Sequence, residues 1–293
     1  MAIFFKAWRR RRNATRKFLK LHIPMGKFAD EDVFIAGFPR SGNTWFQDLI
    51  TMTIYGVRPE LSPPLLAQTL VPDMHSRTFY QRYSAPMFFK THHQPRPEFR
   101  RVVYLLRDGR DSMVSNFHYG RVFHPELDFL DMVTRGTELH HGKWHEHVEA
   151  WLANPFQAEL LVIKFEDLKR DTAGELQRFC DFAGVERDCS LLENVARETV
   201  FAKMQRREII HGEGDPEWPK GHLFRRRGIV GSYQDEMPPE ILAAFMSEAE
   251  PTLRKCGYLD DACLASEPFH EHPQFSPVPL LEQISRKPAM ARH

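Results

Sequence analysis

A glycine-rich turn near the start of the chain has residue types that bind phosphate. Residues 37–44 read GFPRSGNT, and this spacing of two glycines and a threonine is typical of a phosphate-binding loop between a strand and a helix. Gly42 allows a sharp turn, after which backbone N–H groups at the helix start can face an anion. Asn43 stands where loops that bind nucleoside triphosphates carry lysine, whereas Arg40 could clamp an anion bidentately. The loop therefore predicts an anion of lower charge than ATP.

Two further groups of basic residues could bind phosphate. Arg107 ends an apolar run, and Ser115 follows two helical turns later, so that a guanidinium and a hydroxyl could grip one anion. Arg110 and Asp111, which lie between them, are expected to pair with each other or to cap the helix. The run Arg225–Gly228 puts three arginines before a glycine. Such a cluster suits polyanions, although a charge run by itself is usually a solvated face.

The elements that must position these side chains alternate between short apolar runs and amphipathic segments. Four runs have the length and composition of buried parallel strands, and they span residues 32–37, 87–90, 102–106 and 160–165. Helical spacing of apolar residues predicts helices over 43–55, 108–119, 143–152, 174–183 and 239–255. This alternation predicts a single α/β domain with a P-loop-like parallel β-sheet flanked by helices on both faces. Ligands of such sheets bind at the carboxyl ends of the strands.

The composition of the 293 residues excludes several classes of protein. Hydrophobic residues make up 42% of the chain, enough to bury a substantial core, so most of it is not disordered. The 40 basic and 39 acidic residues nearly cancel, which argues against a nucleic-acid partner. No apolar run approaches the roughly 18 residues of a membrane span. The four cysteines include no C-x-x-C pair, which indicates free thiols in a cytoplasmic protein, with a Cys256–Cys263 disulfide as the alternative.

The two ends of the chain differ from its middle. Residues 1–28 contain nine lysines or arginines and no acidic residue. This basic arm could make peripheral contact with anionic lipid, or it could be a solvated tail. Prolines recur over residues 263–293, which predicts a loosely structured tail. We expect the α/β domain to span residues 29–262.

Five segments together resemble the sulfotransferases that use 3′-phosphoadenosine 5′-phosphosulfate (PAPS) as donor. They are FPRSGNTW (38–45), KTH (90–92), LRDGRDSMVS (106–115), FED (165–167) and RRG (226–228). These segments occur in the order of the family over about two-thirds of the chain. Several motifs in the right order are far more specific than any one of them. The resemblance implies an enzyme that moves a sulfuryl group to a hydroxyl and releases adenosine 3′,5′-bisphosphate (PAP).

The resemblance also implies which residues bind the donor. The loop that would hold the 5′-phosphosulfate consists of Arg40, Ser41, Gly42, Asn43 and Thr44. The 3′-phosphate would be bound by Arg107, Ser115, Arg226, Arg227 and Gly228. Adenine would lie against Trp45, Phe165, Thr199 and Phe201; the alternative role of Trp45 is core packing.

Three departures from the family pattern limit what carries over. Arg40 replaces the lysine of animal cytosolic members, which keeps the charge and alters the reach of the side chain. Phe165 replaces a tyrosine of many members, which removes a hydroxyl near adenine. The short dimerisation motif of the family is not recognisable, so the resemblance implies no oligomeric state.

Sulfuryl transfer needs a base for the acceptor hydroxyl and positive charge for the leaving phosphate. His92 matches the base of the family, and imidazole suits this task because its pKa is near neutral. We expect the adjacent His93 to be a structural or acceptor-site residue, although an offset of the motif would exchange the two. Lys90 and Arg40 would stabilise the developing charge, so the reaction requires no metal. His141 and His145 are four residues apart, but no further ligand completes a metal site.

Two other functions fit parts of this pattern. The spacing of the loop would suit a small-molecule P-loop kinase, which Asn43 opposes. A non-catalytic module could bind an adenosine bisphosphate or a sulfated glycan through its arginines. The acceptor of a transferase stays open: many histidines and arginines could favour a glycan or glycolipid. A phenol or lipid-like alcohol is favoured by aromatic residues that could equally belong to the core, namely Phe79, Tyr80, Tyr83, Phe117, Tyr119 and Phe123.

Overall fold

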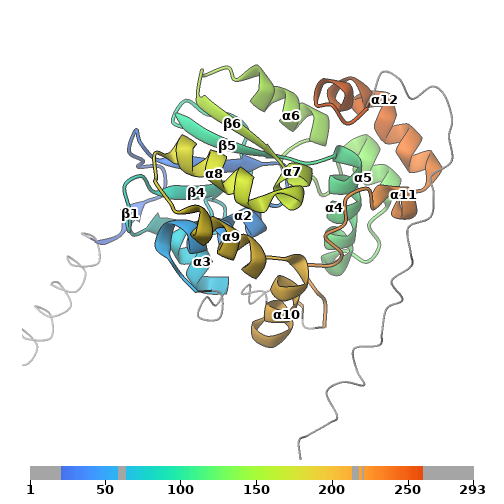
Figure 1. Ribbon diagram of the computed structural model, residues 1–293. Coiled ribbons are helices and arrows are strands. Elements are labelled where there is room, and N and C mark those ends of the chain that lie inside the picture. Colours follow the sequence, from blue (N-terminus) through green and yellow to red (C-terminus); the bar gives the residue numbers. More distant parts are fainter. Residues whose placement is uncertain (1–20, 59–63, 213–217, 220, 260–293) are drawn as a thin grey trace, which may run out of the picture. The chain divides into compact units, whose positions relative to one another are not determined.

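The computed structural model describes residues 21–58, 64–212, 218–219 and 221–259. Its main sheet is parallel, with the strand order β4-β2-β5-β6 (Figure 1). These strands are β2 (Val33–Gly37), β4 (Phe88–Thr91), β5 (Arg101–Leu106) and β6 (Glu159–Lys164). Each predicted strand begins and ends within one residue of the observed one. A short antiparallel pair consists of β1 (Ile23–Pro24) and β3 (Phe79–Tyr80).

Successive side chains of a strand point to opposite faces of the sheet. In the central strands, the side chains on both faces are buried. Ile35 of β2 pairs in register with Val103 of β5, and both belong to the core on the side of α2 (Asn43–Tyr55) and α8 (Thr172–Ala183). On the other side, the Tyr104 ring stacks on Trp151 at a centroid distance of 5.6 Å. Both faces therefore require apolar residues, which explains the continuous apolar runs.

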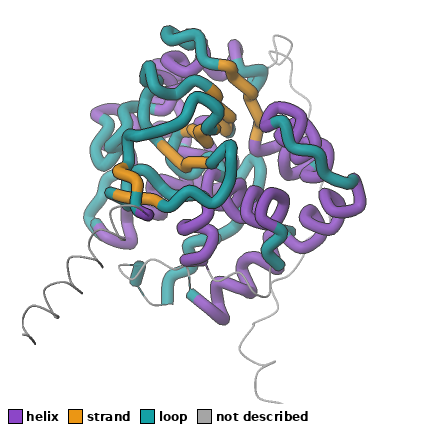
Figure 2. Tube along the Cα trace, turned by 90° about the vertical axis from the view of Figure 1, so that its left-hand side faces the viewer, coloured by secondary structure: helices purple, strands orange, loops and turns teal. Residues whose placement is uncertain are grey.

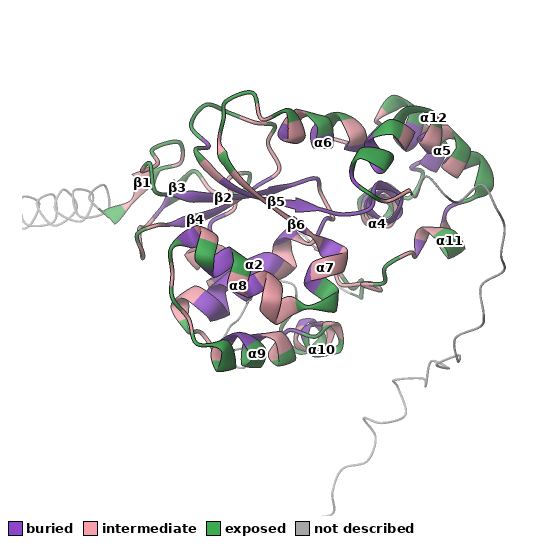
Figure 3. Cartoon of the chain, turned by 45° about the horizontal axis from the view of Figure 1, so that its top comes forward, coloured by how far each residue is buried: buried purple, intermediate pink, exposed green. Residues whose placement is uncertain are grey.

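Helices cover the two faces of the sheet. Figure 3 shows α6 (Trp144–Ala153) above the strands and α2 and α8 below them. Viewed from the side of β1, the strands are surrounded by helices and loops (Figure 2). The remaining helices are α3 (Pro64–Leu70), α4 (Gly109–Phe123), α5 (Phe129–Arg135), α7 (Phe165–Arg170), α9 (Cys189–Glu198), α10 (Phe201–His211), α11 (Tyr233–Glu236) and α12 (Pro239–Lys255). The predicted α/β fold and its five helices are confirmed, whereas α3, α5, α7, α9, α10 and α11 were not expected.

Compactness divides the chain into one unit over Met1–Tyr258 and a second over Leu259–His293, of which only Leu259 is described. Most of the arm expected over 1–28 and all of the tail expected over 263–293 lie outside the described residues. The three described cysteines are free thiols, and Cys263 is not among the described residues. Within the described ranges, no helix combines the length and apolarity needed to cross a membrane.

Candidate active site

A cleft of about 1310 Å³ opens beside the residues that follow the carboxyl ends of the strands. Parallel strands end at one edge of the sheet, and this edge is where such folds bind ligands. The predicted site residues that line the cleft are Arg40, Gly42, Asn43, Thr44, Trp45, Lys90, His92, Arg107, Ser115, Phe165, Phe201, Arg226, Arg227 and Gly228. Ser41 and Thr199 do not line it. Ser41 is buried in the loop, and the buried Thr199 hydroxyl donates to Val195 O at 2.8 Å.

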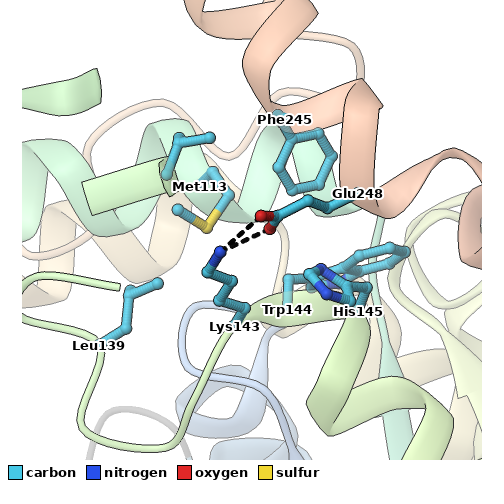
Figure 4. Close-up of a pocket in the computed structure, with 8 residues that line it drawn as sticks. Met113, Leu139, Lys143, Trp144, His145, Phe245 and Glu248 are labelled. Carbon is cyan, nitrogen blue, oxygen red and sulfur yellow. Dashed lines mark hydrogen bonds and ion pairs between the residues drawn. The ribbon is translucent and has the colours of Figure 1, made fainter. Parts of the chain in front are cut away.

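A second cavity does not contribute to this site. It has a volume of about 10 Å³, which is room for no more than one water molecule. Figure 4 shows it beside α4, α6 and α12, where Lys143 forms an ion pair with Glu248 at 2.6 Å. His145 also lines this cavity, away from the large cleft.

The phosphate-binding loop has the geometry that its glycines predict. Gly42 has a φ of +102° at the start of α2, and a Cβ there would lie 2.9 Å from Phe165 Cδ2. A Cβ on Gly37 would meet Leu105 O at 2.7 Å. The Asn43 side-chain amide and Ser41 Oγ are buried without a hydrogen-bond partner among the described residues. Because buried polar groups are nearly always hydrogen-bonded, these atoms indicate a loop that a ligand completes.

Arg107 lies under the loop and links it to the arginine-rich segment. Its guanidinium donates to Arg40 O at 3.0 Å and to Ile229 O at 3.1 Å, and it lies 4.4 Å from the Phe165 ring centroid. Its buried Nε has no hydrogen-bond partner in the described part of the chain. Burial lowers the pKa of Arg107 from its usual value, partly opposed by the Asp111 carboxylate. An anion in the cleft would offset this desolvation.

The side chain of Arg40 extends toward the residues expected at the 3′-phosphate. Its Nε donates to Ser115 Oγ at 3.1 Å and its Nη2 donates to Phe224 O at 3.0 Å. The guanidinium also lies over the Phe224 ring, 4.2 Å from the centroid. In this conformation Arg40 and Ser115 act as one pair, whereas the sequence had assigned them to opposite ends of the donor.

Asp111 has a role that the sequence did not indicate. The prediction that it pairs with Arg110 is wrong, because Arg110 forms an ion pair with Asp108 at 2.6 Å, and Asp108 caps α4. The buried Asp111 carboxylate instead accepts hydrogen bonds from Gly231 N at 2.8 Å and Tyr233 N at 2.9 Å. It thereby fixes the end of the arginine-rich segment to α4.

The arginine run is built into the protein and is not simply a solvated face. Arg225 also lines the cleft, is partly buried, and forms ion pairs with Asp48 at 3.0 Å and Glu208 at 3.3 Å. Arg226 and Arg227 line the cleft and share the carboxylate of Glu236, each at 2.5 Å. Two cations on one carboxylate lower the pKa of Glu236 against the effect of its burial. An incoming phosphate would meet the same two guanidinium groups.

Gly228 approaches a neighbouring helix too closely for any side chain. It has a φ of +59°, and a Cβ there would lie 2.3 Å from Cδ2 of Phe201 on α10. Lys169 of α7 donates a hydrogen bond to Gly228 O and also lines the cleft. No sequence motif pointed to Lys169, although it lies two residues after the FED segment.

His92 is oriented by its neighbours. Its Nδ1 lies 2.7 Å from Gly37 O, so Nδ1–H donates to this carbonyl and Nε2 remains as the acceptor. Burial and the nearby Lys90 ammonium lower the pKa of His92 well below its usual value. The imidazole is therefore neutral. Lys90 Nζ forms an ion pair with Asp73 at 2.9 Å, a partner for which the sequence gave no local signal.

A buried histidine supports the backbone of His92 from behind. Nε2 of His147 lies 3.0 Å from His92 O, and its Nδ1 lies 3.0 Å from the Tyr104 hydroxyl. Burial lowers the pKa of His147 to about 4. This neutral ring therefore links Tyr104 of β5 to the loop after β4.

Only part of the aromatic set lines the cleft. Tyr119 and Phe123 do so, together with Trp218 and Phe224. Tyr119 stacks on Trp218 at a centroid distance of 5.4 Å. Tyr80 is buried instead and packs edge-on against Phe89 at 4.8 Å, so it belongs to the core.

The fold and the loop at the edge of its sheet define an α/β nucleotide-binding protein. The family model described as "Sulfotransferase domain" matches residues 30–257. The chain belongs to this family and is a sulfotransferase. This finding favours the transferase over the kinase and the non-catalytic module.

Curated relatives and solved structures agree with the family. Sulfotransferase 2B1 of Homo sapiens is 26% identical over 238 residues, which cover 74% of this chain and 64% of the relative. Cytosolic sulfotransferase 1 of Danio rerio is 27% identical over 232 residues, which cover 70% of this chain and 77% of the relative. The fold is similar to that of retinol dehydratase in complex with androsterone and the inactive cofactor PAP, with a TM-score of 0.59 and 22% identity over 83% of this chain and 84% of that one. Mouse sulfotransferase SULT7A1, complexed with PAP, has a TM-score of 0.57 and 20% identity over 79% of this chain and 90% of that one.

Proposed function

We propose that this protein transfers the sulfuryl group of PAPS to the hydroxyl of a phenolic or lipid-like alcohol, with His92 as the general base. One observation carries the proposal: a single cleft is lined by the phosphate-binding loop, by Arg107 and Ser115, and by Lys90 and His92. Each group suits one end of such a donor. Retinol dehydratase and mouse sulfotransferase SULT7A1, which have a similar fold, were solved as complexes with PAP, the product of this reaction.

The donor fits because buried polar groups in the loop and beside it lack hydrogen-bond partners among the described residues. Among the described residues, Ser41 Oγ, the Asn43 amide, Trp45 Nε1 and Arg107 Nε are buried and lack a hydrogen-bond partner. The loop and its backbone N–H groups would hold the 5′-phosphosulfate. Arg107 with Ser115, Arg226, Arg227 and Gly228 would hold the 3′-phosphate, which would compete with Glu236 for two of these arginines. Adenine would lie near Trp45 and Phe165, whose rings are 5.7 Å apart and nearly perpendicular, at 74°.

Side chains of this protein can take up both the proton and the negative charge that the transfer releases. The acceptor oxygen forms a bond to sulfur while the bond between sulfur and the 5′-phosphate oxygen breaks. The acceptor proton passes to His92 Nε2, which is free because Nδ1–H donates to Gly37 O. Lys90 would stabilise the charge that develops on the leaving phosphate. Arg40 would reach the same group only after it leaves its present hydrogen bond to Ser115.

An apolar acceptor is supported by the aromatic part of the cleft. Tyr119, Phe123, Trp218 and Phe224 line it, and aromatic rings bind apolar rings and chains with little loss of conformational entropy. Retinol dehydratase has been solved with the apolar alcohols androsterone and retinol. A screen with labelled donor across phenols, sterols, long-chain alcohols and glycans tests this choice. Product from glycans alone would contradict it.

Donor use is tested by thermal unfolding with and without nucleotides. PAP is expected to raise the melting temperature at concentrations where ATP with magnesium does not, because Asn43 replaces the lysine that ATP requires. A larger shift with ATP and magnesium would instead support a kinase. Transfer of labelled sulfate from PAPS to any hydroxyl then separates an enzyme from a binding module.

The base is tested by His92→Ala. We expect the turnover rate to fall about 10²- to 10⁴-fold, the range for loss of a general base. Binding of PAP should change little, since the base faces the acceptor, and this measurement shows that the variant is folded. His145→Ala is the matched control because its side chain lines the small cavity outside the cleft. Full turnover by a folded His92→Ala protein would remove His92 from this role.

A further inference from the structure

Three imidazoles meet beside His92 from three separate segments. His75 follows the bridge between Asp73 and Lys90, His93 follows β4, and His141 precedes α6. One ring nitrogen of each lies within 4.8 Å of the other two. The His75 ring centroid is 4.2 Å from that of His93 and 4.8 Å from that of His141.

Backbone contacts hold each of the three residues in position. His75 N donates to Asp73 Oδ1 at 2.9 Å. His93 is held on both sides, because its N donates to Thr91 Oγ1 at 3.1 Å and its O accepts from Trp151 Nε1 at 3.2 Å. His141 O accepts from Gln94 Nε2 at 3.3 Å. Such fixed positions reduce the entropy that a ligand would otherwise cost.

Packing alone does not account for this cluster. His75 is exposed and the other two rings are partly exposed, so burial of apolar area gains little. Within the described ranges, no hydrogen bond joins the three rings, and no carboxylate forms an ion pair with them; the only ring contact of this kind is His75 Nε2, which accepts from His92 N at 2.8 Å.

We propose that His75, His93 and His141 bind one divalent ion of the zinc class. Neutral imidazole nitrogens are the ligands that such ions prefer, and three of them with one open position form a four-coordinate site. A tetrahedral ion would draw the nitrogens to about 3.4 Å from one another, which small side-chain rotations achieve from the present 4.8 Å limit. A neutral imidazole has one unprotonated nitrogen, and in His75 this is Nε2, which accepts from His92 N. His75 would therefore bind the ion through Nε2, in exchange for this hydrogen bond. The fourth position is left for water or for an oxygen of the acceptor.

This site goes beyond the proposed transfer, which uses none of the three imidazoles. It also differs from the His141–His145 spacing, which the sequence offered without a further ligand to complete a metal site. His141 and His145 are four residues apart, yet His145 lines the small cavity while His141 lines the large cleft. In the folded chain, His141 therefore lies beside His75 and His93 and not beside His145.

The test is calorimetric titration of Zn²⁺ into the full chain, carrying no polyhistidine tag and stripped of metal with a chelator. We expect one equivalent to bind. Co²⁺ should give the strong visible absorption of tetrahedral coordination at the same stoichiometry. His93→Ala and His141→Ala should each weaken binding by at least about 100-fold, since loss of a ligand exceeds the effect of losing an outer partner. His145→Ala should bind as the wild type does.

Several results would overturn the site. They are the absence of stoichiometric binding, binding that both ligand variants retain, and an equal loss in His145→Ala. If His93→Ala does not fold, as judged by circular dichroism, His141→Ala and His75→Gln decide the question from the two other loops. The titration uses neither nucleotide nor acceptor, so its failure leaves sulfuryl transfer untouched. A protein that binds zinc but transfers no sulfate would contradict only the proposed function.

Discussion

Replacement of Asp111 by asparagine tests how the donor site is held together. One carboxylate oxygen accepts from Gly231 N at 2.8 Å, and the other accepts from Tyr233 N at 2.9 Å and from Ser232 Oγ at 3.2 Å. Either orientation of an amide loses at least one of these bonds and leaves a buried N–H facing another donor. A hydrogen bond to a charged group contributes about 1.5–3 kcal/mol, and an unsatisfied buried donor costs about 1–3 kcal/mol. We therefore expect Asp111→Asn to lower the free energy of unfolding by about 3 kcal/mol.

The same substitution should weaken donor binding, both through the arginine-rich segment and through loss of the carboxylate charge 3.7 Å from Arg107 Nη2. Asp111 fixes the residues that directly follow Arg226, Arg227 and Gly228. If half of the lost free energy appears as freedom of this segment, the donor KM rises about tenfold, since 1.4 kcal/mol corresponds to a factor of ten. Urea unfolding and initial rates at varied PAPS concentration measure the two effects.

Asp128→Asn is the matched control for this measurement. Asp128 also accepts a backbone hydrogen bond, from Asp131 N at 2.8 Å, but at the exposed start of α5. Asparagine caps a helix about as well as aspartate does, so this substitution should change the free energy of unfolding little and leave the donor KM unchanged. The free energy of unfolding of Asp111→Asn could instead lie within about 0.5 kcal/mol of the wild-type value, the range of an ordinary surface change, with an unchanged donor KM. That result would refute the role of Asp111 in fixing the arginine-rich segment to α4.

Two further substitutions address the donor site directly. Arg107→Ala should raise the donor KM at least about tenfold, because the guanidinium also joins Arg40 O to Ile229 O; an unaltered affinity for PAP, measured by calorimetry, would remove Arg107 from the 3′-phosphate site. Gly228→Ala should lower both stability, by about 1–3 kcal/mol, and donor affinity, because its Cβ would lie 2.3 Å from Phe201. Gly184→Ala separates this clash from backbone strain, since Gly184 has a φ of +69° with no atom within 4 Å of its Cβ; equal losses in urea unfolding for both variants would show that the contact with Phe201 is unimportant.

The acceptor and the base depend on different parts of the cleft. His92 is set by contacts to Gly37 and His75 around the end of β4, whereas the aromatic residues come from α4 and from the segment after α10. Loss of the base should therefore lower turnover for every acceptor, while changes at Tyr119 or Phe123 should alter the choice among acceptors. These two effects are separable by kinetics with several alcohols.

Local features of the sequence determined the strands, five of the helices and the glycine-rich turn at residues 37–44. Apolar runs and helical spacing act within about ten residues of chain, so the pattern alone indicates β2, β5 and α2. The same holds for Gly42, where a turn into a helix requires a positive φ. The six-residue α7 was not predicted, because so short a segment cannot show a helical period. The eleven-residue α10 was missed as well, although it is longer than the predicted α6.

Only the tertiary structure decided which charged and imidazole groups become neighbours. Asp111 meets Gly231 across 120 residues, Arg225 meets Asp48 across 177, and Arg40 meets Ser115 across 75. The sequence marked most of these residues as polar or basic, but it paired Arg110 with Asp111, its neighbour along the chain. Ionic and hydrogen-bonding partners are chosen by distance in space, which the order of the strands in the sheet sets. That order is a property of the folded chain, and no spacing within a single motif contains it.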